Sequence, residues 1–186
     1  MNRKEEILKA AYEITGDEGV EALNARSVAA KVGVNHALVH YYFPRREDLL
    51  MGVAGYLKQR FEADVEHFQS KVKKSATGVE ASLTQCEAYC KPTSRLYRVW
   101  ASLFVAAQSS PELRKLLLAF WQTWSADLGT RIDAAVEKDA AHGDSPFADG
   151  KMLLATMLGV GLLAQLAGNV KEASIHLDAI DQSLLT

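Results

Sequence analysis

The sequence predicts an all-α protein, and three of its features support that prediction. Apolar side chains recur at the helical period of 3.6 residues along most of the 186 residues, and no segment sustains the alternation of a β-strand. Only four prolines interrupt the chain. The composition, 48% hydrophobic and 24% charged, is that of a globular protein with its own core. We expect about nine helices: an N-terminal three-helix unit followed by a helical bundle.

The N-terminal unit is predicted to contain three short helices, over residues 4–18, 25–32 and 35–43. The first follows a stripe of apolar residues and ends where glycines accumulate. Asn24 is a suitable N-cap for the second helix, and Gly33 stops it. Asn35 is a suitable N-cap for the third helix, which must end before Pro44 because proline disfavours the helical conformation of its predecessor.

Longer helical stripes fill the rest of the chain, over residues 46–74, 79–90, 92–108, 111–141, 148–167 and 174–185. Lys73, Lys74, Ser75 and Gly78 are expected to close the first of them. Pro92 and Pro111 lie where a helix start tolerates proline. The segments 142–146 and 168–172 read as loops because they combine glycine with proline, aspartate or asparagine. We therefore predict two domains, residues 1–47 and residues 48–186.

Composition excludes several classes of protein. The 21 Lys and Arg against 23 Asp and Glu exclude a protein that holds nucleic acid by bulk charge. The charged N-terminus has no apolar signal core, so we expect a cytoplasmic protein. The most apolar stretch, 152–167, is shorter than the roughly 20 residues that span a bilayer, so we interpret it as a buried helix and expect no membrane partner.

The two cysteines, Cys86 and Cys90, are too few for a disulfide framework. They lie four apart on one helix face without a histidine at ligand spacing, which favours small buried side chains over a metal or redox site. Regulation through these thiols remains the alternative. The sequence predicts no cofactor and no metal.

The segment most informative about function is 25–50, ARSVAAKVGVNHALVHYYFPRREDLL. Its two short helices, joined through Gly33, have the shape of a helix-turn-helix. The whole run resembles the DNA-binding domain of the TetR family of transcriptional regulators. The matching residues are Arg26, Val28, Ala29, Gly33, Val34, Tyr42, Phe43, Glu47 and Leu49. The departures are Val32, Asn35, Ala37, Val39, His40 and Arg46, of which His40 replaces a tyrosine that contacts the DNA backbone in the family.

The resemblance implies a dimeric, ligand-responsive repressor that binds a palindromic double-stranded operator and is released by a small-molecule effector. The predicted DNA-binding residues are Asn24, Arg26, Asn35, His36, Ala37, His40, Tyr41, Arg45 and Arg46. The two asparagines cap helices whose N–H groups can face phosphate, and the arginines near the start of the fourth helix can reach it as cations. The histidines, Ala37 and Tyr41 would meet the bases.

Two observations favour a plainer interpretation of this domain. Residues 1–50 hold seven Lys or Arg and eight Asp or Glu, which is not a basic composition. Tyr42 and Phe43 end a short helix, where aromatic residues usually belong to the core. A helical interaction module that has lost DNA binding is therefore the alternative function. An enzyme is not expected, because the chain has no nucleophile elbow, phosphate loop or paired-carboxylate motif.

The remainder of the chain is predicted to bind a ligand and to dimerise. The segments 96–100, 111–114 and 161–166 are similar to the TetR-family subgroup of betaine-pathway repressors. Aromatic and apolar residues of two helices are candidates for a pocket that takes an apolar or cationic molecule: Trp100, Leu103, Phe104, Phe120, Trp121 and Trp124. Simple core packing is the alternative for each of them. The apolar helix over 148–167, with its small Gly159, Gly161 and Ala164, and the tail over 174–185 predict a two-fold four-helix homodimer interface.

Overall fold

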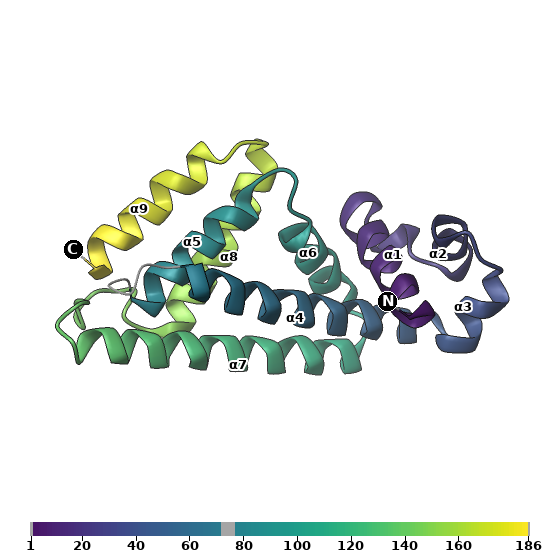
Figure 1. Cartoon of the computed structure of the whole chain (residues 1–186), viewed down its shortest axis with the longest axis horizontal. Helices are drawn as coiled ribbons and strands as arrows, with labels where there is room; N and C mark the ends of the chain where they lie inside the picture. Colours follow the sequence, from purple (N-terminus) through teal and green to yellow (C-terminus); the bar gives the residue numbers. More distant parts are fainter. Residues whose placement is uncertain (1, 72–76, 186) are drawn as a thin grey trace. The chain divides into compact units, whose positions relative to one another are not determined.

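The computed structural model describes residues 2–71 and 77–185, and these contain nine α-helices, one 3₁₀ turn and no strand (Figure 1). The all-α prediction is confirmed. The elements are α1 Arg3–Glu18, η1 Val20–Ala22, α2 Ala25–Val32, α3 His36–Tyr42, α4 Arg46–Lys71, α5 Gly78–Cys90, α6 Leu96–Ala106, α7 Pro111–Val136, α8 Gly150–Ala167 and α9 Lys171–Leu185.

The chain divides into two compact units. The N-terminal unit comprises Met1–Phe61 with Arg98–Leu117, and the C-terminal unit comprises Glu62–Tyr97 with Leu118–Thr186. The predicted division between residues 47 and 48 falls within α4, and it remains a prediction.

In the N-terminal unit, α1 packs against η1 and α2, and α2 packs against α3. Asn2 and Glu5 form a capping box that fixes the start of α1. One face of α1 is fully buried through Ile7, Ala11 and Ile14. This core supports the short helices α2 and α3, which at two turns each have little stability of their own.

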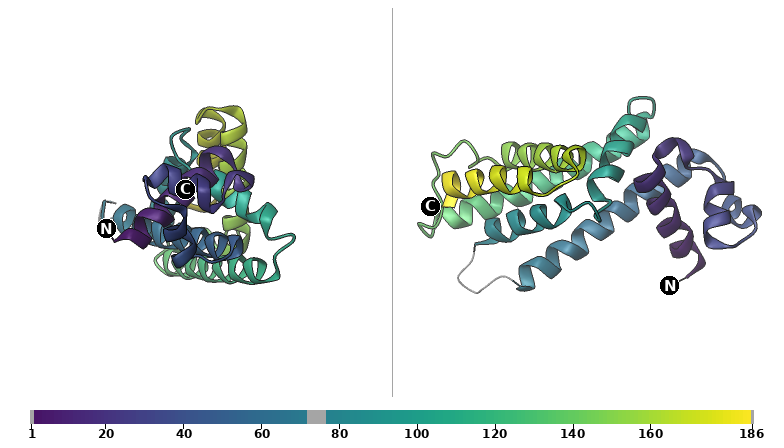
Figure 2. Two further views of the ribbon diagram at one scale, coloured as in Figure 1. Left: turned by 90° about the vertical axis from the view of Figure 1, so that its right-hand side faces the viewer. Right: turned by 90° about the horizontal axis from the view of Figure 1, so that it is seen from above.

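The C-terminal unit is built around α5, α8 and α9, which pack against one another (Figure 2). Asp149 caps α8 by accepting from the N–H groups of Lys151 and Met152 at 2.9 and 2.8 Å. A side chain on Gly150 would overlap backbone atoms of Ser125 and Gly129, so α8 begins in close contact with α7. Small residues on the inner face of α8 thus allow close helix packing within one subunit.

Three predicted helix ends differ from the structure by three residues or more, each because of a local capping or turn interaction. Pro92 belongs to a turn closed by the Ser94 N–H and the Lys91 carbonyl at 2.9 Å, so α6 begins only at Leu96. Asp139, with φ 54°, takes the left-handed conformation just beyond the end of α7, which is Val136 and not residue 141. The Asn169 side chain accepts a hydrogen bond from the N–H of Lys171 at 3.0 Å, and α9 begins there, three residues before the predicted Ser174.

The predicted end of the fourth helix, at Lys73, Lys74 and Ser75, lies outside the described residues. Gly78 opens α5 instead of closing α4, because Thr77 is the N-cap of α5 and forms a capping box with Glu80.

Within the described residues, α8 is the one helix long and apolar enough to cross a membrane by length and composition. The core helix of a folded domain passes the same test. One face of α8 is buried at helical spacing, through Leu153, Met157, Val160 and Ala164. The sequence predicts a buried helix, but α8 is buried on this face only, because Met152, Leu163 and Leu166 on the other side are exposed in the single chain.

Candidate nucleic-acid interface

The N-termini of α2 and α3 are capped as predicted. The Asn24 side chain accepts hydrogen bonds from the backbone N–H groups of Arg26 and Ser27, both at 3.0 Å. The Asn35 side chain accepts from the N–H of Ala37 at 2.9 Å. Since these N–H groups already have protein acceptors, the two asparagines act first as caps. Their predicted phosphate contacts remain predictions.

The turn between α2 and α3 requires a glycine. Gly33 has φ 75°, in the left-handed region that strains residues with a side chain. Its N–H and that of Val34 both bond to the Ala29 carbonyl, at 2.9 and 3.0 Å. The turn directs α3 away from α2 as a helix-turn-helix requires.

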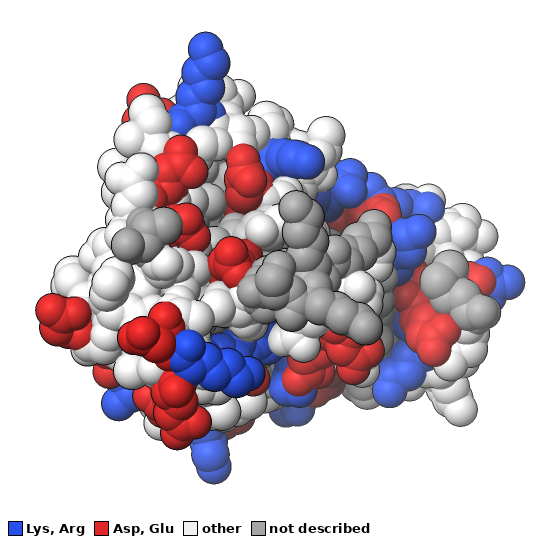
Figure 3. All heavy atoms as spheres, turned by 60° about the vertical axis from the view of Figure 1, so that its left-hand side comes forward, with Lys and Arg blue, Asp and Glu red and all other residues white. Residues whose placement is uncertain are grey.

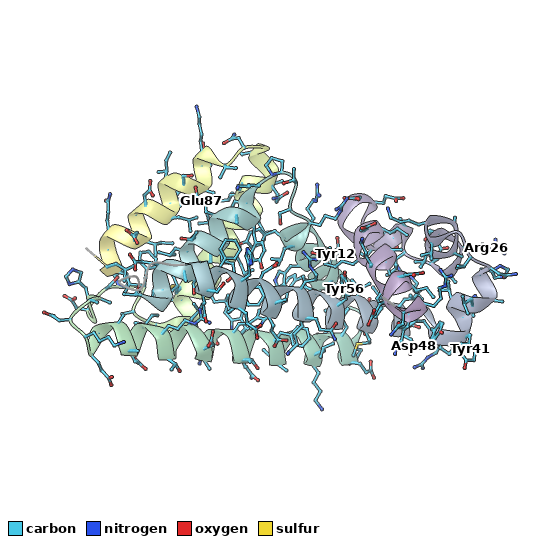
Figure 4. All side chains as sticks on the ribbon, viewed as in Figure 1. Tyr12, Arg26, Tyr41, Asp48, Tyr56 and Glu87 are labelled. Atoms are coloured by element: carbon cyan, nitrogen blue, oxygen red, sulfur yellow. The ribbon has the colours of Figure 1, made fainter. Side chains whose placement is uncertain are left out.

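The helix α3 has two clearly different faces. Val39 is fully buried and Phe43, just beyond the helix, is 5% exposed, so Phe43 belongs to the core as predicted. His36, Ala37, His40 and Tyr41 are exposed, and Tyr41 reaches 77%. We call these four residues the α3 outer face. In Figure 4 the labelled Tyr41 and Arg26 point outward from the N-terminal unit.

Charge is arranged favourably around this face, although residues 1–50 as a whole are balanced. The segment 22–46 holds two arginines, one lysine and two histidines before Arg46, and it holds no aspartate or glutamate. The acidic residues of the first 50 positions lie before and after this segment. The segment itself is therefore basic, but acidic residues from outside it lie beside three of its cations: Lys31 is 3.6 Å from Glu13, Arg45 is 3.0 Å from Asp48, and Arg46 is 3.7 Å from Glu21.

Arg45 is held at the start of α4 by Asp48. Its guanidinium lies 3.0 Å from one Asp48 carboxylate oxygen, and its backbone N–H donates to the other at 2.9 Å. These hydrogen bonds lower the pKa of Asp48 and raise the pKa of Arg45. The Arg45 side chain is nevertheless 74% exposed, so its charge remains available to a phosphate.

Arg46 is oriented differently from its neighbour. Its Nε donates to the Leu23 carbonyl at 3.1 Å, and a terminal guanidinium nitrogen donates to the Val20 carbonyl at 2.7 Å. The guanidinium is also 3.7 Å from a Glu21 carboxylate oxygen. The structure therefore places this predicted phosphate contact against the turn that precedes α2.

A concavity of about 460 Å³ brings five of the nine predicted DNA-binding residues together. Its lining is Asn24, Ala25, Arg26, His40, Phe43, Arg45, Arg46 and Leu49. It combines cationic and hydrogen-bonding side chains with three apolar ones, Ala25, Phe43 and Leu49. Such a surface suits an anionic ligand such as a DNA phosphate.

A second concavity, of about 230 Å³, lies between α5 and α9 and has the opposite charge. Its carboxylates are Glu80, Glu87, Asp178 and Asp181. Burial, followed by the charges of Glu80 and Asp178, raises the pKa of Asp181. Figure 3 shows acidic side chains at several places on the viewed face, together with basic ones. These carboxylates repel phosphate, so the basic concavity is the better candidate for DNA.

The six predicted ligand-binding residues fall into two groups. Trp100, Leu103 and Phe104 belong to the N-terminal unit, where the first two are buried and Phe104 is 59% exposed. Phe120, Trp121 and Trp124 belong to the C-terminal unit. The rings of Phe120 and Trp124 lie 5.7 Å apart, and both residues are buried. The structure thus brings this pair together, and the assignment of all six to one pocket remains a prediction.

Sequence reasoning missed a buried polar cluster in the C-terminal unit. Gln85 donates to the Tyr89 hydroxyl at 2.9 Å, and this hydroxyl donates to Asp64 at 2.9 Å. The rings of Tyr89 and Tyr97 meet edge to face with centroids 6.3 Å apart. The i, i+4 spacing of Gln85 and Tyr89 is visible in the sequence, but nothing there pairs them with Asp64, which lies 25 residues before Tyr89.

The two cysteines belong to the same region. Cys86 and Cys90 are buried free thiols, as their interpretation as small apolar side chains requires. The Cys86 sulfur lies 3.1 Å from the Tyr97 hydroxyl. The pKa of Cys86 is raised, first by its hydrogen bond with Cys90 and then by burial, which keeps the thiol protonated and unreactive.

Comparison with known proteins supports the interpretation of the N-terminal helices as a DNA-binding domain. The sequence profile described as "Bacterial regulatory proteins, tetR family" matches residues 7–53, which cover most of α1, all of α2 and α3, and the start of α4. The HTH-type transcriptional regulator BetI of Rhizobium meliloti (strain 1021) is 24% identical over 140 residues, covering 75% of this chain and 69% of BetI.

Two solved structures show how far the fold is shared. A TetR-family transcriptional regulator from Agrobacterium tumefaciens has a TM-score of 0.84 at 17% identity, covering 98% of this chain and 97% of its own. A transcriptional regulator from Saccharomonospora viridis, solved in complex with choline, has a TM-score of 0.78 at 19% identity, with 98% and 97% coverage.

Proposed function

We propose that this chain, as a member of the TetR family of bacterial transcriptional regulators, is a cytoplasmic repressor. It binds a palindromic operator as a dimer and leaves the operator when a small molecule binds. The observation that carries this proposal is the α3 outer face. Four exposed residues of the second helix of a helix-turn-helix stand where such a helix meets the major groove. This function involves no catalysis.

Each predicted DNA contact then has a role. Arg26 and Arg45 bind phosphates from the rim of the basic concavity, and Asn24 and Asn35 hold the helix ends against the backbone. The α3 outer face contacts the bases, where histidine and tyrosine donate hydrogen bonds and the short Ala37 allows close approach.

The homodimer is proposed to form through the outer face of α8. Large apolar side chains are exposed there, with Met152 and Leu163 at 52% and Leu166 at 85%, and Ile175 of α9 is 64% exposed. Ala155 and Gly159 lie on the same strip, so a second helix can approach closely. A second copy of the chain would cover this strip and form a four-helix interface.

The effector is proposed to be a small apolar or cationic molecule held by aromatic residues of the bundle. The buried pair of Phe120 and Trp124 supports this, because aromatic faces attract cations and apolar groups alike. A structural neighbour was solved with choline, which has that chemistry. Effector binding would shift α4, the helix that begins at the helix-turn-helix, and change the spacing of the two recognition helices.

The DNA-binding proposal is tested by fluorescence anisotropy. The full chain is titrated against a labelled duplex from its own upstream intergenic region and against a scrambled duplex, at several salt concentrations. We expect preferential binding that weakens as salt rises. Equal binding to both duplexes, followed by no enrichment in a genome-wide selection of bound fragments, would instead support the interaction module.

The effector proposal has its own test. Choline is titrated into the preformed protein–DNA complex while tryptophan fluorescence and DNA anisotropy are recorded together. Quenching together with DNA release supports a cationic effector that binds near tryptophan. Quenching without release contradicts the proposed coupling, since only a ligand with different affinities for the two states can shift them.

A further inference from the structure

Arg46 joins two segments of the N-terminal unit that are far apart in sequence. It opens α4, and the carbonyls that it contacts lie 23 and 26 residues earlier, at Leu23 and Val20. These carbonyls belong to η1 and its C-cap, just before Asn24 caps α2. A cation at the end of a helical turn, where carbonyls point outward, is favourably placed.

The contacted turn fixes where α2 begins. The Ala22 carbonyl accepts from the Asn24 amide at 3.2 Å and from the Ser27 hydroxyl at 2.7 Å. The Leu23 side chain is fully buried. Arg46 therefore binds the same short turn from which the α2 cap and the adjacent Arg26 project.

The side chain type matters for this role. A guanidinium is a rigid fork that donates in two directions at once, whereas a lysine ammonium is a compact charge on a flexible stem. Two carbonyls separated along a turn match the fork. The side chain of Arg46 is 42% exposed, against 74% for Arg45, in keeping with a guanidinium directed partly inward.

We infer that Arg46 is a positioning residue of the DNA-binding domain, which holds the turn before α2 against α4 and so sets the position of Arg26, and that it does not itself bind phosphate. This inference rests on the proposed DNA-binding function. It predicts that a positive charge at position 46 is not enough for wild-type operator affinity, and that the two-directional hydrogen bonding of the guanidinium is required.

The test measures operator affinity as a function of salt for Arg46→Lys and Arg46→Ala in the full-length chain. Each phosphate contact that is lost reduces the slope of log affinity against log salt by about 0.9. We expect both variants to bind about tenfold more weakly, because the turn that positions Arg26 is no longer held against α4. The slope should stay at the wild-type value, because Arg26 itself is retained as a surface cation that can still reach phosphate. Both should also unfold at a lower temperature than wild type.

Arg45→Ala is the matched control, since Arg45 is adjacent and exposed. It should weaken binding with a slope reduced by about 0.9, the signature of a lost phosphate contact. Glu21→Gln is the second control. It removes the 3.7 Å ion pair but leaves both carbonyl bonds of Arg46, so operator binding should not weaken.

Three results would overturn the inference. Wild-type binding by Arg46→Lys, together with a slope reduced by about 0.9 in Arg46→Ala, would identify a phosphate contact. Wild-type affinity in both folded variants would leave Arg46 with a purely structural role. A loss with Glu21→Gln equal to that of Arg46→Lys would assign the role to the ion pair.

Folding and function are kept apart in this design. Circular dichroism and thermal unfolding establish that each variant is folded at the temperature of the titration, and if Arg46→Ala is not, Arg46→Lys decides alone. A wild-type protein without operator preference overturns the proposed function. Preference in wild type that survives Arg46→Lys unchanged overturns only this inference.

Discussion

The outer faces of α3 and α8 are both exposed, yet they carry opposite chemistry. The α3 outer face consists of two histidines, one alanine and Tyr41, whereas the outer face of α8 carries Met152, Leu163 and Leu166. Behind each, the same helix buries an apolar face, through Val39 in α3 and Leu153 in α8. Exposure alone thus says only that a partner is possible, and the side chains indicate which kind of partner.

The difference has a simple physical basis. A polar face loses little by remaining in water until DNA replaces the water, so it suits a reversible complex. Leaving a contiguous apolar strip exposed to water is unfavourable by about 25 cal/mol for each Å². Such a strip therefore favours a lasting interface that covers it. The two faces predict a transient nucleic-acid partner and a stable protein partner.

The largest effect is expected from placing charge on the α8 face. The double substitution Leu163→Glu with Leu166→Glu should weaken dimerisation at least about a hundredfold, because buried carboxylates without partners cost several kcal/mol. Sedimentation at micromolar concentration would then show monomers, and operator binding would be lost. Thr123→Glu, on an exposed position of α7, is the control and should leave the dimer intact. An unchanged dimer in the double variant would refute the proposed interface.

The second prediction compares a tightly packed glycine of α8, on the side opposite the exposed strip, with a glycine of α4 that has open space beside it. Gly150→Ala should reduce the free energy of unfolding by about 1–3 kcal/mol, because the new methyl group would overlap the backbone of Ser125 and Gly129. Gly55→Ala is the matched control, because Gly55 lies inside the helix α4 and outside the proposed dimer interface. The structure shows nothing within 4 Å of its added methyl group, so unfolding in urea should be unchanged or slightly harder. Equal destabilisation by both variants would contradict the packing described for Gly150.

The sequence predicted the helix-turn-helix well because the interactions that define it are local. Asn24, Gly33 and Asn35 act within three or four residues of their own positions, as caps or as a left-handed turn. The exposed side of α3 follows from helical spacing once Val39 is assigned to the core. Such features can be recognised in a single sequence without knowledge of the fold.

The remaining features depend on contacts that the sequence does not display. Arg46 has the residue type and position of a phosphate contact, and only the fold shows that its acceptors are the carbonyls of Val20 and Leu23. The end of α7 depends on the left-handed backbone of Asp139, a conformation that other residue types adopt more readily. The aromatic residues proposed for one pocket fall in two units, which helical periodicity cannot reveal.

The third prediction concerns the α3 outer face. Tyr41→Ala should weaken operator binding about tenfold without changing dimerisation, because a 77% exposed ring contributes little to the fold. Tyr41→Phe distinguishes the hydroxyl from the ring, since only the alanine variant removes both. His67→Ala, at an exposed position of α4, is the control in the same anisotropy assay. Wild-type affinity in Tyr41→Ala would remove Tyr41 from the DNA interface.

The smallest effect is expected from Asp48→Asn, which changes the partner of Arg45 at the start of α4. Hydrogen bonds from Arg45 lower the pKa of Asp48 below its ordinary value of 3.8 in the folded protein. The carboxylate therefore stabilises the fold above that value, and this contribution is lost as pH falls through the lower folded pKa. The stability difference between wild type and variant, measured by urea unfolding, should be modest near pH 6, since the pair is exposed, and should shrink progressively below about pH 4. A difference that stays constant across this range would mean that Asp48 acts only as a neutral cap, and that Arg45 owes its position to something other than the charge of its partner.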